Sequence, residues 1–155
     1  MIKEQGGIKI KGLAHLELFG PDGILKQEQW VKNIITTVGL THIADRMAST
    51  LSEDAMGYMA VGTDATAVAA GNTALGGEVA SSRTALSSRT HSGAVVTYVC
   101  SFGAGVGTGA LYEAGIFNAA AAGIMLNRLT YAVVNKGASD TLQITWSLTF
   151  SDDGA

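Results

Sequence analysis

The chain has 155 residues, with 10 basic and 13 acidic side chains, and a formal net charge of −3 at neutral pH. Hydrophobic residues make up 47% of the chain and charged residues only 15%, below the ~25% of an ordinary soluble domain. This balance excludes the basic surface that binds nucleic acid. The length fits one domain, and no apolar run approaches the ~18 residues that cross a membrane. Because the first residues lack the apolar core of a signal peptide, we expect synthesis in a cytoplasm.

Two alternating segments predict a β-hairpin over residues 8–32. From Ile8 to Leu18, apolar or small residues occupy every second position, which is the period of a strand with one buried face. Pro21-Asp22-Gly23 then supplies a turn, since proline fixes φ and glycine accepts a positive φ. A second strand over residues 24–32, with Trp30 inside it, is expected to return antiparallel.

Residues 36–50 predict one amphipathic α-helix. Its apolar stripe consists of residues at helical spacing, namely Leu40, Ile43, Ala44, Met47 and Leu51. His42 falls on the opposite face, which we expect to be solvated. Thr36 or Thr37 is the expected N-cap.

The main β region is predicted over residues 56–151. Strand patterns occur at Met56–Val61, Val96–Phe102, Met125–Val134 and Leu142–Phe150. The last is the most regular, and we expect Trp146 at its centre to be buried. Short alternating strands separated by turns predict a single all-β domain over residues 1–155, mainly an antiparallel sandwich or a jelly-roll-like barrel.

The segment 62–77 is long for a loop and contains mostly small residues. Small side chains allow a backbone to lie close to another surface and lose little entropy on ordering. We therefore predict an arm that lies on a neighbouring subunit, with contact residues Thr63, Thr66, Val68, Ala70 and Asn72. The alternative is a loop folded over its own sheet. The low charge also predicts self-association, as a dimer or trimer.

The glycine-rich run from Gly103 to Gly109 offers one candidate cofactor site. Starting at Gly105, it satisfies the G-x-G-x-x-A pattern of dinucleotide-binding turns. Such a site also needs an acidic residue about 20 positions later, and no acid occurs between Glu113 and Asp140. We interpret the run as a connection between strands and expect no cofactor.

The residues that most often carry catalysis or bind metals form no recognisable pattern. The histidines, His15, His42 and His91, have no ligand spacing, so we expect no metal site. Cys100 shares a strand face with Tyr98 and Phe102, which predicts an unreactive core thiol. We therefore predict no catalytic residue and no enzymatic activity.

Glu113 is the one acidic residue in an otherwise apolar segment, residues 110–117. A carboxylate in such a segment needs hydrogen-bond donors. We expect backbone N–H groups or an arginine to hold it, with Arg83, Arg89 and Arg128 as the alternatives. The candidate polar network is Glu113 with Arg83 and Arg128.

Two ordered patterns resemble structural proteins of tailed bacteriophages. The first follows the hairpin with its Gly20-Pro21-Asp22-Gly23 turn and runs from Asn33 to Ala44. It resembles the N-x-I-T-x-x-G-L-x-x-I-A entry of many virion proteins. The second runs through Val61-Gly62, residues 70–75 and Glu78-Val79 to an arginine, and later through residues 113–118 and 125–128. It is similar to the "VGxG … GDTAL … EV … R … ExGIF(N/D)A … LxR" pattern of head-decoration proteins and tail-fibre attachment modules, with Asn72 in place of the usual aspartate.

The resemblance implies a non-enzymatic virion protein that is made in the host cytoplasm. Because the strand pattern ends at Phe150, shortly before the end of the sequence, we expect the module to be the whole protein. That favours a capsid decoration or cement protein, which binds the major capsid protein on the outer surface of the head. The alternative is a tail, collar or fibre-attachment component.

Overall fold

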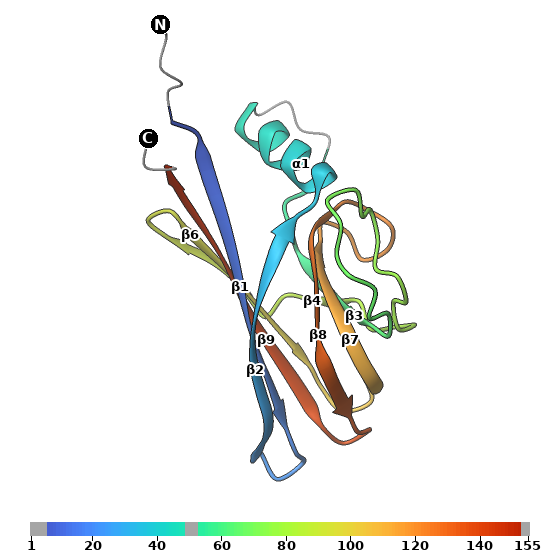
Figure 1. Cartoon of the computed structure of the whole chain (residues 1–155). Helices are drawn as coiled ribbons and strands as arrows, with labels where there is room; N and C mark the ends of the chain where they lie inside the picture. Colours follow the sequence, from blue (N-terminus) through green and yellow to red (C-terminus); the bar gives the residue numbers. More distant parts are fainter. Residues whose placement is uncertain (1–5, 49–52, 153–155) are drawn as a thin grey trace, which may run out of the picture.

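Antiparallel strand pairing organises the computed structural model, which describes residues 6–48 and 53–152 (Figure 1). Within these residues the chain forms nine strands and one helix, so the prediction of an all-β fold with a single helix is confirmed. The elements are β1 (Ile8–Phe19), β2 (Leu25–Ile35), α1 (Thr37–Ala48), β3 (Tyr58–Gly62), β4 (Thr84–Ala85), β5 (Ser88–Ser92), β6 (Val95–Phe102), β7 (Gly109–Phe117), β8 (Met125–Lys136) and β9 (Thr141–Asp152).

The strands belong to one curled sheet with the order β4-β3-β7-β8-β2-β1-β9-β6-β5. One half contains β2, β1, β9, β6 and β5, and the other contains β4, β3, β7 and β8. The halves are joined where the end of β2 pairs with β8, at Ile34 opposite Arg128 and Ile35 opposite Asn127. The main hydrophobic core contains side chains from both halves, so the sheet curls around its own apolar face.

Strict alternation identified the strands at the centre of the first half. In β9, Leu142, Ile144, Trp146 and Leu148 are buried, and the hydroxyl-rich positions between them face outward. Trp146 is 0% exposed, so the prediction that it is buried is confirmed. The indole N–H donates a 2.8 Å hydrogen bond to Asn33 Oδ1 on β2. Asn33 pairs with Gly12 in register, and a Cβ on Gly12 would overlap the Asn33 side chain, so a larger residue there has to displace Asn33.

The prediction of how α1 packs is wrong. His42 is buried, whereas Leu40 and Met47 of the predicted stripe are exposed. The first turn of the helix packs directly on the backbone of β8. The contact is so close that a Cβ on Gly39 would overlap the carbonyl oxygen of Leu126. Thr36 is the N-cap, with its Oγ1 accepting a hydrogen bond from Gly39 N at 3.0 Å. Ile43 packs against the core, and Leu51 lies outside the described residues.

The connection between β6 and β7 was predicted from the sequence, but β7 itself was not. Residues 103–108 form a turn between β6 and β7 in which Gly105 and Gly107 have positive φ, as expected for a strand connection. No strand was predicted at β7. This strand is buried on both faces over most of its length, so it lacks the alternation that indicates a strand.

Candidate functional site

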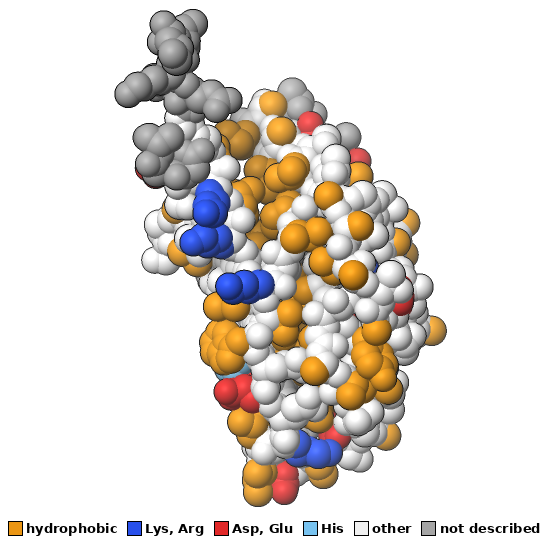
Figure 2. Space-filling model, viewed as in Figure 1, with side chains coloured by type: hydrophobic (Ala, Val, Ile, Leu, Met, Phe, Trp, Pro, Cys, Tyr) orange, Lys and Arg blue, Asp and Glu red, His pale blue; other side chains and the backbone are white. Residues whose placement is uncertain are grey.

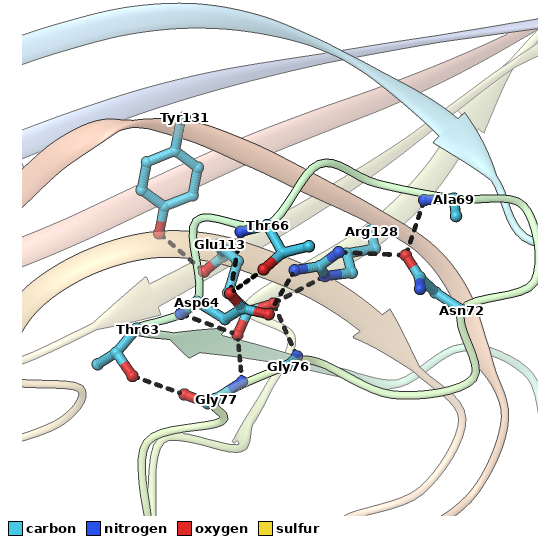
Figure 3. A network of polar contacts seen from close by, with 10 residues as sticks. All are labelled: Thr63, Asp64, Thr66, Ala69, Asn72, Gly76, Gly77, Glu113, Arg128 and Tyr131. Carbon is cyan, nitrogen blue, oxygen red and sulfur yellow. Dashed lines mark hydrogen bonds and ion pairs between the residues drawn. The ribbon is translucent and has the colours of Figure 1, made fainter.

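A buried ion pair lies beneath the loop of residues 62–77 (Figure 3). Glu113 is on β7 and Arg128 on the adjacent strand β8, where the register brings the two side chains together. Arg128 Nε donates a 2.7 Å hydrogen bond to Glu113 Oε2, and the two side chains are 3% and 0% exposed. A charged pair removed from water in this way is tolerated only when its remaining donors and acceptors also find partners.

The backbone of the loop satisfies the carboxylate of Glu113. Gly77 N donates to Oε1 at 2.7 Å, and Gly76 N donates to Oε2 at 3.0 Å. Close approach of the backbone explains the glycines, since a Cβ on Gly62 would overlap Glu113 Oε1 and one on Gly76 would overlap Asp64. The small residues of this segment are thus required in part by contacts within the chain.

Arg128 binds the other side of the loop. Its Nη1 donates to Asn72 Oδ1 at 3.1 Å, and its Nη2 lies 3.4 Å from Asp64 Oδ2. Asn72 Oδ1 also accepts a hydrogen bond from Ala69 N, and Asp64 Oδ1 accepts two from Thr66. The hydrogen bonds from Thr66 lower the pKa of Asp64, and the nearby Arg128 charge acts in the same direction. One guanidinium group therefore binds the loop at two points, Asp64 and Asn72.

A buried tyrosine on β8 completes the network. The hydroxyl of Tyr131 on β8 donates a 2.9 Å hydrogen bond to the carbonyl oxygen of Glu113. Burial raises the pKa of Tyr131 well above its ordinary value, and the Glu113 charge adds to the effect, so the hydroxyl stays a donor. Glu113 is fully buried with both carboxylate oxygens bonded, and this geometry holds a loop in place.

The structure brings together two of the three residues of the predicted network. Arg83 lies elsewhere and binds Glu78 through two hydrogen bonds of 3.0 and 2.7 Å. Its guanidinium also stacks 3.6 Å from the centre of the Phe117 ring. Including Arg83 in the Glu113 network was therefore wrong. Arg89 donates to the carbonyl oxygen of Met56.

The predicted arm residues lie on a loop that covers its own sheet. Asn72 binds Arg128, and the Ala70 carbonyl accepts a 2.8 Å hydrogen bond from Thr37 N at the start of α1. Val68 is half-buried, whereas Thr63, Thr66 and Ala70 are exposed. The alternative of a loop folded over its own sheet therefore describes its position within the chain. Contact of the exposed residues with a neighbouring subunit stays a prediction.

The remaining residues that were considered for chemistry are dispersed. Cys100 is buried, and burial raises the pKa of its thiol to about 12, which agrees with an unreactive core cysteine. His91 is exposed on β5 and His42 is buried in α1, while His15 lies on β1. Among the described residues, no helix has the length and hydrophobicity needed to span a membrane.

Sequence reasoning missed several members of the network. Asp64, Gly76, Gly77 and Tyr131 were not assigned to it. The available signal was an acid and an amide eight residues apart, Asp64 and Asn72, followed by the paired glycines Gly76 and Gly77.

Comparisons with protein-family models, curated proteins and solved structures found no match to this chain.

Proposed function

We propose that this chain is a non-enzymatic structural protein of a bacteriophage particle, a decoration protein that binds the outer surface of the head shell and cements it. The observation that carries the proposal is the loop 62–77, whose small exposed side chains are held in place by the buried Glu113–Arg128 pair. A surface that is already ordered loses little entropy when it binds. The virion-like order of motifs supports the same assignment, because Asn72, Glu113 and Arg128 belong to both the pattern and the network.

The partner in this proposal is the major capsid protein, contacted by many copies at once. Within a dimer or trimer the copies are linked, so their individually weak contacts add to firm attachment. Small, uncharged side chains such as Ala65, Ala67 and Ala69 allow the loop to pack closely on a partner without desolvating charges.

Self-association is the second part of the proposal. A groove of about 490 Å³ lies between the end of α1 and the ends of β1 and β9, lined in part by Ile8, Met47 and Phe150. Figure 2 shows hydrophobic side chains along this hollow. Met47 is 77% exposed and Ile8 is 74% exposed. Apolar surface of this kind supports a dimer or trimer in which a second copy covers it.

The decisive experiment is quantitative mass spectrometry of purified particles. A decoration protein is present in hundreds of copies, on the order of the number of capsid subunits. A few dozen copies or fewer indicate a tail, collar or fibre position instead, and absence from particles overturns the proposal.

The role of the loop is tested by adding Ala67→Arg protein to particles that lack the native protein. The matched control is Ala138→Arg, an exposed alanine in the turn between β8 and β9. We expect Ala67→Arg to reduce binding at least tenfold and Ala138→Arg to leave it unchanged. Equal binding by the two variants would show that the loop makes no contact with the particle.

A further inference from the structure

Four side chains of complementary chemistry meet on the outer face of the β1–β2 hairpin. His15 and Glu17 lie on β1, and Glu28 and Trp30 lie on β2. In the strand register His15 stands opposite Trp30, and Glu17 stands directly opposite Glu28. Two like charges in directly opposed positions destabilise a strand pair unless a cation lies between them.

The imidazole of His15 lies between the two carboxylates. Its Nε2 is 3.4 Å from Glu28 Oε2, and its Nδ1 is 3.5 Å from Glu17 Oε1. One donor atom from each of the three residues lies within 4.8 Å of the other two. Two ligands at about 2.1 Å from a tetrahedral zinc ion stand about 3.4 Å apart, so His15 Nε2 and Glu28 Oε2 have the spacing of a ligand pair.

His15 Nε2 is buried and forms no hydrogen bond within the described residues. A buried polar atom without a hydrogen bond needs an explanation, and a metal ion supplies one. The ring of Trp30 stacks on the imidazole at a centroid distance of 3.8 Å with an interplanar angle of 1°. This stacking fixes the plane of the ring and shields one side of the site.

We propose that His15 Nε2 and Glu28 bind a divalent transition-metal ion, with Zn²⁺ as the best fit. In this site Glu17 accepts a hydrogen bond from Nδ1–H of His15 and orients the ring, as carboxylates do in many histidine metal sites. The donor set selects against Mg²⁺ and Ca²⁺, which prefer oxygen ligands throughout. Water fills the remaining positions, and the ion links β1 to β2.

A metal ion that links β1 to β2 would stabilise the hairpin, because β2 is held by little buried surface of its own. β2 has no buried residue along its whole length, and Trp30 is 60% exposed. Towards β8, its middle is held by side chains, with Gln27 and Gln29 donating to carbonyl oxygens of Val133 and Ala132. An ion bound on the outer face stabilises the folded hairpin because the site does not exist in the unfolded chain.

Isothermal titration of the tag-free, chelator-treated full chain with ZnCl₂ tests the proposal. We expect one ion per chain, a rise in the thermal unfolding midpoint, and no binding of MgCl₂ in the same range. His15→Gln and Glu28→Gln should weaken binding at least 100-fold, and Glu17→Gln should weaken it by about 10- to 100-fold. His91→Gln, which changes an exposed histidine on β5, is the matched control and should bind like the native chain.

A second measurement locates the ion independently of affinity. Binding of Co²⁺ should produce a visible d–d absorption band and should quench the fluorescence of Trp30. Both effects should disappear in His15→Gln, and Trp30→Phe should lose the quenching while retaining the absorption band. Absence of stoichiometric Zn²⁺ binding, or unchanged binding by a folded His15→Gln variant, would overturn the proposal.

Discussion

Replacing Glu113 with glutamine removes one charge of the buried pair and keeps the size of the side chain. The guanidinium of Arg128 is then left 3% exposed with Asp64, at 3.4 Å, as its nearest remaining negative charge. Removing one partner of a buried pair costs about 3–5 kcal/mol, because the other charge stays desolvated. We place Glu113→Gln at about 3 kcal/mol, the lower end, because Asp64 offers partial compensation and one amide oxygen still accepts from the loop.

The loop sets a limit on this cost. If residues 62–77 detach, water reaches Arg128 and the penalty is relieved, so part of the loss appears as local opening. Urea unfolding therefore needs to be combined with hydrogen exchange of the loop amides. We expect a lower free energy of unfolding together with faster exchange at Gly76 and Gly77, whose N–H groups bond to Glu113.

A double-mutant cycle with Arg128→Met separates the interaction from the individual losses. The double variant should be more stable than the sum of the single effects indicates, by about 1–3 kcal/mol. The matched control is Glu78→Gln, which breaks the more exposed pair with Arg83 and should cost about 1 kcal/mol or less. Additive effects at Glu113 and Arg128, or equal losses at Glu113 and Glu78, would show that the buried pair has no special contribution to stability.

Three further changes test the rest of the structure. Trp146→Ala should lower the free energy of unfolding by about 3–5 kcal/mol through the cavity it leaves, and an unchanged urea midpoint would contradict the assigned burial. Gly12→Ala should cost about 2–3 kcal/mol, since its methyl group displaces Asn33 and leaves the indole N–H of Trp146 unpaired. The same change should cost less in an Asn33→Ala background, and equal costs would exclude this explanation. Burial, followed by the charge of Arg46, lowers the pKa of His42, so folding favours the neutral ring, and stability present above the ordinary pKa of about 6.5 is lost as the pH falls below it. Thermal midpoints should therefore decline from pH 7 to pH 5, and a His42→Gln variant with an equally steep decline would assign the effect to another group.

Strand prediction succeeded where a strand has one buried and one solvated face. β9 shows strict alternation because its outer side chains meet water and its inner ones meet the core. β7 escaped prediction because the loop 62–77 covers its second face, where Leu75 packs with Phe117 and Met125 in a separate small cluster. A covering loop is a tertiary feature, and residues far away in the sequence determine it.

The helix α1 was predicted from the sequence, but the face by which it packs was not. Its sequence contains an apolar stripe, yet its contact with β8 depends on Gly39 and the Thr36 cap. Close backbone approach decides the orientation of α1, and Leu40 and Met47 are left exposed as a result. Periodicity correctly indicated a helix but could not identify which of its faces packs.

The sequence predicted the kind of site and one of its partners, Arg128, but it could not exclude Arg83. An isolated acid in an apolar segment required donors, and Glu113 has them. The choice of Arg128 over Arg83 follows from strand register, which places Arg128 opposite Gly115 on the neighbouring strand. The grouping of His15 with Glu28 likewise depends on the register of β1 and β2, so no spacing within one segment could indicate it.

The buried pair also bears on why the loop matters. Apolar side chains of similar volume often stabilise a protein as well as a buried ion pair does. Here, however, the amides of Gly76 and Gly77 point into the site and need an acceptor, which an apolar side chain cannot supply. Arg128 also donates to Asn72 and Asp64 on the loop, so the pair fixes the course of the loop over the sheet. For the binding surface that we propose, a segment of small exposed residues held this firmly has a lower cost of ordering when it meets a partner, since the ordering has already been done by folding.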